Sequence, residues 1–322
     1  MQSAIKPPDD QPSPSLKTIP SLEINVGFYT QVLGLGILPT DTNINKLWVN
    51  ADWMFHNATC NFWRSAENFS VNDYCMWANS QAVSLRRVNF NDGIVLSDGE
   101  GWSSGGFMAD CKVEKMVSSG SQQQYLFRNN NWGYFENGVW NMVFTGVNVD
   151  TIPTGGWPYE PYTKEETVPK IQEKPYLVYD EDNGYGVMVP EKRTECQGIS
   201  WENGVKGTFY SLNMFYVADA QKDNADTINK ALKEGKNLLL TPGIYTLDKP
   251  ITVEEKDTIV SVVSSPNPKI VSNYIITVNG NAILNFALVI CASYSKVHIT
   301  KANRVVAMGN FCFFISNFKQ CF

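Results

Sequence analysis

Few residue types in this sequence are spaced for nucleophilic, redox or metal chemistry. The chain has two histidines, His56 and His298, and seven cysteines that form neither a CxxC pair nor a Cys/His cluster, so no zinc site is predicted. A Ser/His/Asp or Cys/His device would depend on His56 alone. His56 stands beside Asn57 in a polar stretch that is typical of a surface loop. We therefore expect no metal and no cofactor.

Paired carboxylates are the next group that could act as acid and base. Asp98 and Glu100 flank Gly99, Glu165 and Glu166 are adjacent, and residues 180–182 are consecutive acids. Each group lies among Gly, Pro or other charged residues, a composition that indicates solvated turns. These carboxylates are therefore not expected to be catalytic.

Composition and charge limit the class of protein and its partners. The 322 residues are 43% hydrophobic and 18% charged, as in ordinary globular chains. A net charge of −6 offers no basic face for a phosphate backbone, so nucleic acid is not an expected partner. Residues 261–322 contain five basic residues and no acidic one, and we expect them to form an atypical tail. Asparagines interrupt its apolar stretch 275–292, so no membrane span is expected either.

Residues 22–150 consist of short runs rich in Val, Phe, Tyr, Trp and Thr, separated by Asn, Asp, Gly and Ser. This pattern is typical of strands and turns. Phe69, Phe90 and Val113 are 21 and 23 residues apart, and a recurrence near twenty favours a parallel β-solenoid. Asn-rich turns such as 89–92 suit left-handed corners that bond along a stack. A β-sandwich with irregular loops is the alternative.

The remaining segments suggest a domain order. Residues 1–21 contain five prolines and predict a disordered leader, and 22–150 form the first β-domain. Residues 151–222 form a linker with a hairpin excursion around Asp182-Asn183-Gly184. A helix is predicted from Asp223 to Lys233, capped by Asp223 or Asn224 and stopped by Gly235. An apolar strand that ends in a Pro-Gly turn follows it.

Several blocks carry a family resemblance. Residues 225–232 and 235–245 look like the lead-in of a pectate-lyase-type right-handed β-helix. Upstream, the chain resembles the bacterial branch of glycoside hydrolase family 55, whose members are exo-acting β-1,3-glucanases. The blocks that carry this second resemblance are 26–36, 61–68, 80–82 with 86–87, 104–107, 121–124 and 137–141. Together the likeness covers about residues 22–260.

The resemblance implies an all-β fold, a single-stranded right-handed parallel β-helix of pectin-lyase type, with the start of a second β-helix at residues 223–260. It implies inverting hydrolysis of laminarin-type β-1,3-glucan by a secreted monomer, although no signal peptide is visible. The water-holding positions of the family would fall on Gln81 and Ser104 here. Trp102, Gln123 and Trp140 are expected to bind substrate.

The chain departs from the family pattern after Val260. The family's general acid is a Glu on the second β-helix, and this sequence has no Asp or Glu after Asp257. We expect an incomplete chain whose residues 261–322 are not native to the family, and whose activity is in doubt. A non-catalytic glucan-binding fragment is therefore one alternative. A polysaccharide lyase with Arg86 or Arg87 as base is another, although no Asp cluster for calcium is recognisable.

Overall fold

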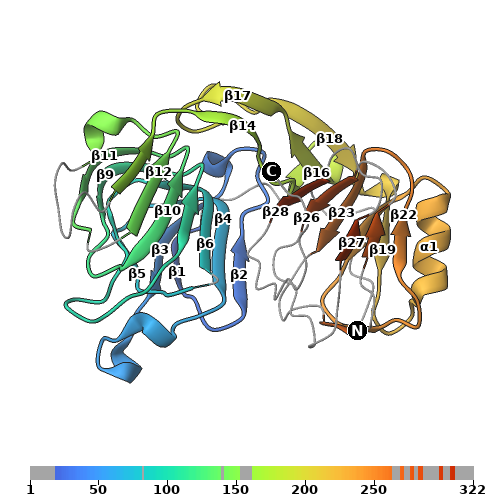
Figure 1. Cartoon of the computed structure of the whole chain (residues 1–322), viewed down its shortest axis with the longest axis horizontal. Coiled ribbons are helices and arrows are strands. Elements are labelled where there is room, and N and C mark those ends of the chain that lie inside the picture. The colour runs from blue at the N-terminus through green and yellow to red at the C-terminus, as the bar shows by residue number, and fades with distance from the viewer. Residues whose placement is uncertain are drawn as a thin grey trace.

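In a computed structural model of the chain, the described residues form an all-β fold apart from one α-helix and five short 3-10 helices. The structure describes residues 19–81, 83–138, 141–152 and 162–262, and the backbone of five short strands between residues 269 and 308. Figure 1 shows two strand-rich bodies side by side, joined by a segment that passes over both. No helix within the described residues is long and apolar enough to cross a membrane.

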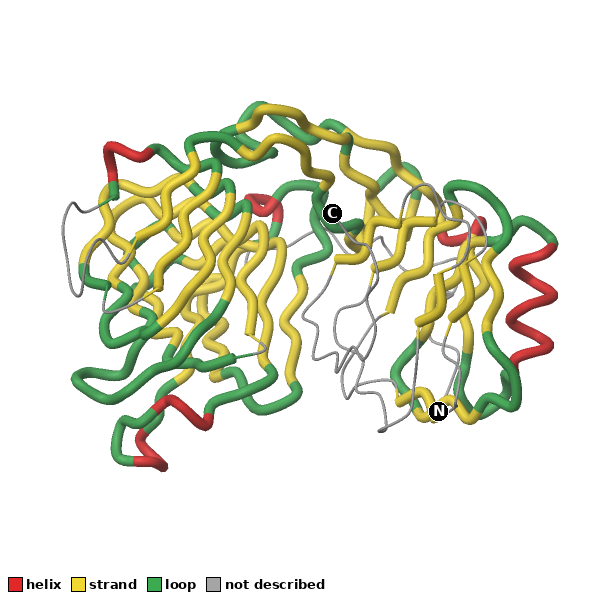
Figure 2. The backbone as a smooth tube through the Cα atoms, in the orientation of Figure 1, coloured by secondary structure: helices red, strands yellow, loops and turns green. Residues whose placement is uncertain are grey.

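The first body contains thirteen strands that pair only in parallel. One row, the even row, follows the order β2 (Thr30–Leu33), β4 (Arg64–Val71), β6 (Val83–Phe90), β8 (Phe107–Ala109), β10 (Gln124–Arg128), β12 (Asn141–Thr145) and β13 (Tyr162–Glu165). The other row, the odd row, follows the order β1 (Ile19–Asn25), β3 (Asn43–Val49), β5 (Cys75–Trp77), β7 (Ile94–Val95), β9 (Lys112–Ser118) and β11 (Asn131–Glu136). Because the chain alternates between the rows, each turn of chain stacks on the one before, as Figure 2 shows.

The register of this first stack fits the predicted recurrence. Ala66 pairs with Leu85, and Phe90 pairs with Val113, which is the expected 23-residue step. Phe69 and Phe90, which are 21 residues apart, are not partners, because Phe69 pairs with Val88. The step between β4 and β6 is therefore 19 residues, not 21.

One left-handed residue recurs in successive turns of the even row. Asn68, Arg87, Asp110 and Asn129 have φ between +50° and +64°, and Gly146 occupies the next equivalent place at +63°. Asparagine tolerates this conformation at low cost. Bonds along the stack also occur at the Asn-rich turns, where Asn91 Nδ2 donates to Asn72 Oδ1 at 2.8 Å. Bonding between stacked asparagines is thus confirmed at the 89–92 turn, but the left-handed corner expected there is wrong, because none of residues 89–92 has a positive φ.

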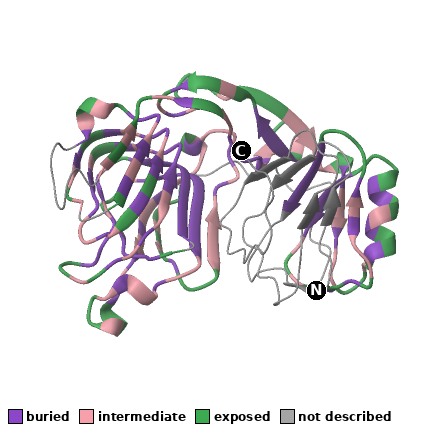
Figure 3. Cartoon of the chain, viewed as in Figure 1, coloured by how far each residue is buried: buried purple, intermediate pink, exposed green. Residues whose placement is uncertain are grey.

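The core of the first stack lies between the two rows. It is almost entirely apolar and includes Trp77, Leu85, Phe127 and Phe144, each fully buried. Phe127 stacks on Phe144 with ring centroids 5.1 Å apart. The purple strands of Figure 3 show how far this interior is shielded. Alternate side chains of each strand point inward and form a continuous apolar filling.

The joining segment, which we call the strap, covers residues 168–211. Its strands are β14 (Val168–Gln172), β15 (Tyr176–Asp180), β16 (Gly184–Pro190), β17 (Lys192–Cys196) and β18 (Gly207–Ser211), all paired antiparallel. Val187 and Val189 pack with Leu239 of the second body, whereas Tyr176 and Met188 pack with Ile37 of the first. The predicted hairpin is confirmed, since Asp180 pairs with Gly184.

The second body starts with β19 (Phe215–Ala218) and α1 (Ala225–Lys233), followed by β20 (Asn237–Leu240), β21 (Ile244–Thr246), β22 (Ile251–Val253) and β23 (Thr258–Val262). Asn224 caps α1 by accepting from Asp226 N and Thr227 N, and Gly235 follows the helix with φ +83°. The helix and its stop are therefore confirmed. The parallel strands β24 (Lys269–Val271), β25 (Ile276–Val278), β26 (Ala282–Asn285), β27 (Val297–Ile299) and β28 (Val305–Met308) continue this second stack.

Three predicted limits differ from the structure. β1 begins at Ile19, inside the expected leader, and residues 1–18 lie outside the described range. β13 adds a turn to the first stack at residues 162–165, which the composition had suggested were linker. The second stack begins at Phe215, because β19 pairs in parallel with β20.

The 3-10 helices are η1 (Pro39–Asp41), η2 (Asp52–Met54), η3 (Ala58–Cys60), η4 (Val149–Thr151) and η5 (Leu212–Met214).

Candidate active-site edge

The candidate site lies where the strands of the even row begin. Gln81, Ser104 and Gln123 come shortly before β6, β8 and β10, on three successive turns of the stack. Gln81 N donates to Gly105 O at 2.8 Å, and Gln123 N donates to Ser103 O at 3.2 Å. The backbone therefore places the three residues beside one another, although 42 positions separate the first from the last. The 23-residue spacing of Gln81 and Ser104 does correspond to one turn.

The buried neighbours of these residues hold the edge together. Ser80 Oγ accepts from Ser104 N at 2.8 Å. Gln122 is fully buried and uses both ends of its amide: Oε1 accepts from Gly105 N, and Nε2 donates to Asn79 O and Leu96 O at 2.8 and 2.7 Å. The turns are thus fastened by Ser80 and Gln122.

The side chains of Gln81, Ser104 and Gln123 are left open by this arrangement. Gln81 is exposed, and Ser104 and Gln123 are half-buried. Among the described residues, none of the three side chains makes a hydrogen bond. A hydroxyl and two carboxamides on consecutive turns can hold a water molecule or sugar hydroxyls, because each both donates and accepts.

Aromatic side chains surround the same end of the stack. Trp102, two residues before Ser104, is 59% exposed, and Trp53 is 54% exposed. Tyr29 stacks on Trp63 at 4.7 Å, with the rings 14° from parallel. Trp and Tyr rings suit sugar faces because they are apolar and carry a polar edge. Trp140 lies outside the described residues.

The other tryptophans of the first stack differ in burial. Trp77 is fully buried and Trp132 nearly so, and both belong to the core of the first stack. Trp63 is half-buried, and Trp157 lies outside the described residues. Exposed and core tryptophans therefore coexist in the first stack.

An arginine reinforces the edge from inside. Arg64, at the start of β4, is buried and donates from Nη1 to Asn79 Oδ1 at 2.9 Å. Its guanidinium lies over the Phe28 ring, 4.2 Å from the centroid. Burial lowers the pKa of Arg64 to about 10, which still leaves it charged at neutral pH. Arg64 thus holds a buried positive charge against Asn79, the residue before Ser80.

The carboxylates that were expected to lie in solvated turns differ in solvent exposure. Glu100, Glu165, Glu166 and the hairpin acids Glu181 and Asp182 are exposed, in agreement with solvated turns. Asp98 is not: only 5% of this residue is exposed, and it bonds to Ala51 N and to His56. The interpretation of Asp98 as a solvated turn residue is wrong. His56 is exposed as expected, but it is paired.

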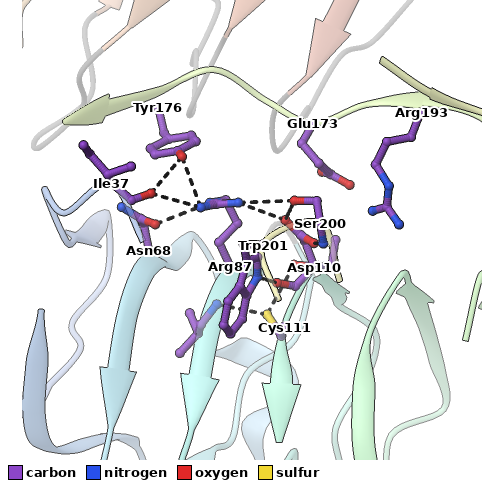
Figure 4. A network of polar contacts seen from close by, with 12 residues as sticks. Ile37, Asn68, Arg87, Asp110, Cys111, Glu173, Tyr176, Arg193, Ser200 and Trp201 are labelled. Carbon is purple, nitrogen blue, oxygen red and sulfur yellow. Dashed lines mark hydrogen bonds and ion pairs between the residues drawn. The ribbon is translucent and has the colours of Figure 1, made fainter. Parts of the chain in front are cut away.

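The strap docks on the opposite end of the even row through a buried polar network, shown in Figure 4. Arg87 Nη1 donates to Asp110 Oδ2 at 3.2 Å, and its Nη2 donates to Tyr176 Oη at 3.1 Å. Ser200 Oγ donates to Asp110 Oδ2 at 2.7 Å, and Trp201 Nε1 donates to Asp110 O at 2.8 Å. Burial raises the pKa of Tyr176 to about 12, so it remains a neutral donor. Because Arg87 is buried and hydrogen-bonded to Asp110 and Tyr176, we interpret it as a structural residue and not as the base of a lyase.

Two more ion pairs fasten the strap beside this network. Arg128 and Glu173 form a bidentate pair at 2.8 and 2.9 Å, and Lys174 Nζ pairs with Glu67 Oε2. Burial would raise the pKa of Glu173, but the charge and hydrogen bonds of Arg128 hold it below its ordinary value. Sequence reasoning missed Glu173 and Lys174, because they stand in a stretch that has the composition of a linker.

Comparison with known proteins agrees with this architecture. A family model, the LAM55 pectate lyase-like domain, matches residues 215–300. A curated exo-beta-1,3-glucanase of Streptomyces sp. (strain SirexAA-E / ActE) is 44% identical over 248 residues, which are 75% of this chain and 40% of that enzyme.

Two solved structures share the fold. The structure of sacteLam55A from Streptomyces sp. SirexAA-E has a TM-score of 0.75 at 36% identity, over 89% of this chain and 56% of that chain. A glutamate-to-alanine variant of sacteLam55A in complex with glucose gives 0.72 at 36% identity, over 88% and 56% of the two chains. This chain thus spans about half the length of these relatives.

The family match corrects one expectation about the tail. It extends to residue 300, so the interpretation of residues 261–322 as foreign to the family is wrong for residues 261–300. The resemblance read from the sequence blocks is confirmed: the chain is similar to the bacterial exo-β-1,3-glucanases of glycoside hydrolase family 55.

Proposed function

We propose that this chain carries the water-holding half of an inverting exo-β-1,3-glucanase that acts on laminarin-type glucan. In this proposal the first stack is a single-stranded right-handed parallel β-helix, and the second stack starts a further β-helix. Parallel pairing at steps of 19 and 23 residues supports this description. The similarity to an exo-beta-1,3-glucanase and to a glucose-bound variant supports a carbohydrate ligand.

The inverting reaction needs two groups on opposite faces of the sugar. A carboxylic acid protonates the leaving oxygen on one face of the sugar. On the other face, a water molecule attacks the sugar carbon, and the enzyme must leave space for this water beside the residues that hold it. Gln81 and Ser104 are the candidates for holding that water. The side-chain oxygen of each residue can accept a hydrogen bond from an O–H of the water molecule. This contact orients the water so that a lone pair of its oxygen points at the sugar carbon.

Substrate binding is assigned to the groups beside them. Trp102 offers a sugar-sized apolar ring with 59% of its surface exposed. Gln123, one turn beyond Ser104, can hydrogen-bond sugar hydroxyls. Trp140 is the third candidate by resemblance, and its role rests on sequence alone.

One observation carries the proposal. At this edge the side chains that fasten the turns are those of Ser80 and Gln122, whereas the side chains of Gln81, Ser104 and Gln123 make no hydrogen bond within the described residues. If Gln81 and Ser104 had only a structural role, their side chains should hydrogen-bond to neighbouring turns. Their open side chains are instead free to meet a ligand.

A second candidate function is glucan binding without turnover. The family's general acid is a Glu of the second β-helix, and we assign none here, because the sequence has no Asp or Glu after Asp257. The exposed Trp102 and Trp53 would still bind sugar in the absence of a proton donor.

Two measurements on the purified full chain separate these functions. Glucose release from laminarin tests turnover, and calorimetry with laminarioligosaccharides tests binding. For a hydrolase, Gln81→Ala and Ser104→Ala should each lower kcat by about 10²- to 10⁴-fold with little change in KM. The first sugar released should be the α-anomer, as inversion requires.

The binding function predicts no glucose release but a saturable isotherm that Trp102→Ala weakens. Gln221→Ala, an exposed residue near the start of the second stack, is the matched control and should change neither readout. Turnover that survives Gln81→Ala and Ser104→Ala unchanged would remove the site assignment. Absence of both turnover and binding would reject the two functions together.

A further inference from the structure

Three potential metal ligands that the proposed function does not use, Asp52, His56 and Asp98, lie close together beside the pocket that Trp102 helps to line. Asp52 and His56 come from η2 and the turn after it, and Asp98 comes from the loop after β7. His56 and Asp98 line a pocket of about 650 Å³, together with Phe55, Glu100 and Trp102. Two loops from different turns of the stack thus meet at one point.

The distances suit a small divalent ion. His56 Nδ1 lies 3.0 Å from Asp98 Oδ1 and 3.7 Å from Asp52 Oδ1, and the three ligand atoms all lie within 4.8 Å of one another. Ligands bound to one metal at about 2.0–2.2 Å stand roughly 3–4 Å apart. An ion can therefore sit among these atoms with only small side-chain movements.

Each carboxylate already has its second oxygen held by a protein donor. Asp98 Oδ2 accepts from Ala51 N at 2.7 Å, and Asp52 Oδ2 accepts from Asn50 Nδ2. One oxygen of each group is therefore left to face the imidazole. Outer hydrogen bonds of this kind orient ligands in metal sites.

The charge balance also calls for a cation. The Asp98 side chain is only 7% exposed, and within the described residues its ion pairs involve His56 alone. A buried carboxylate is costly unless a positive partner accompanies it. A bound metal ion would place a positive charge directly beside this buried carboxylate.

We propose that Asp52, His56 and Asp98 bind one divalent transition-metal ion of the zinc class. The histidine nitrogen selects against calcium, which takes oxygen ligands, and favours Zn²⁺, Co²⁺ or Ni²⁺. Water in the adjoining pocket completes the coordination. The ion ties η2 to the 98–102 loop, which also carries Trp102, so metal binding stabilises this corner of the first stack.

Zinc titration of the chelator-treated full chain by calorimetry tests the site. We expect saturable binding of one ion per chain and a higher Tm with zinc. His56→Ala and Asp52→Asn should abolish both effects and still fold, since these side chains are 58% and 66% exposed. Asn50→Ala, which removes the donor to Asp52, should weaken zinc roughly 10- to 100-fold.

Three controls make the result specific. Glu100→Gln changes an exposed acid of the same pocket, and His298→Gln removes the other histidine of the chain; both should leave zinc binding unchanged. A Co²⁺ spectrum should lack a thiolate charge-transfer band, because no cysteine takes part. Absence of saturable binding, binding that persists in His56→Ala and Asp52→Asn, or a preference for Ca²⁺ over Zn²⁺ would overturn the proposal.

Discussion

Glu173 is the residue whose removal should most clearly show how the strap is held on the first stack. Its carboxylate forms two hydrogen bonds with the Arg128 guanidinium, at 2.8 and 2.9 Å. The two side chains are 4% and 11% exposed, respectively. Glu173→Gln keeps the shape of the side chain but removes its charge, and leaves Arg128 buried near Arg86 without its hydrogen-bonded carboxylate partner.

The expected cost follows from this burial. An exposed ion pair contributes about 0–1 kcal/mol, whereas removing one partner of a buried pair costs about 3–5 kcal/mol. The charge of nearby Arg86 disfavours an unpaired Arg128 further. Glu173→Gln should therefore lower the free energy of unfolding by about 3 kcal/mol or more. Replacing both partners, as Glu173→Leu with Arg128→Met, should recover much of that loss.

Urea unfolding followed by tryptophan fluorescence is the assay. All nine tryptophans lie between Trp48 and Trp201, so the signal reports the first stack and the strap. Asp73→Asn is the matched control, because Asp73 pairs with Lys46 at 3.6 Å on the surface and should cost about 1 kcal/mol at most. A loss below about 1 kcal/mol for Glu173→Gln, or a double variant as unstable as the single one, would refute this reasoning.

Three further outcomes are expected. The pKa of Glu173 is lower in the folded protein than in the unfolded chain, so ionised Glu173 stabilises the fold above about pH 4.3. This contribution is lost as the pH falls through the folded-state pKa. In Glu173→Gln, the free energy of unfolding should therefore depend less steeply on pH in the acid range. Asn224→Ala removes the cap of α1 and should cost about 1 kcal/mol in thermal unfolding. Gly34→Ala would place a Cβ 1.9 Å from Asn68 O and should cost about 1–3 kcal/mol, whereas Gly184→Ala, with open space but φ +71°, should cost less.

The repeat could be predicted from the sequence because each turn of a stacked fold has the same requirements. Every turn needs apolar residues inside, as at Leu85 and Phe127, and a residue that can adopt a left-handed φ at the corner, as at Asn68 and Asn129. Both requirements make residue types recur in the sequence with a period near twenty. Gln81 and Ser104 came from the family resemblance, and their spacing, which equals one step of the register, agrees with their place on neighbouring turns.

The features that escaped prediction depend on contacts across long sequence distances. Glu173 meets Arg128 over 45 positions, and Asp98 meets Ala51 over 47. Around each acid the local composition is that of a solvated turn, and nothing in it signals a distant buried partner. The strap illustrates the limit most clearly: it has the composition of a linker, yet it contributes core residues to both bodies.

The division of labour along the even row explains how one scaffold can carry a site without losing stability. Its inward side chains fill the core and its C-terminal end is fastened by the strap. At its N-terminal edge, backbone hydrogen bonds and the side chains of Ser80 and Gln122 close the turns. The residue next to each fastening position is then free to change. Because every turn presents such a residue at the same edge, side chains from distant parts of the chain collect there in a row. Polar and aromatic groups at Gln81, Trp102, Ser104 and Gln123 are therefore placed by the register of the stack rather than by any loop of their own.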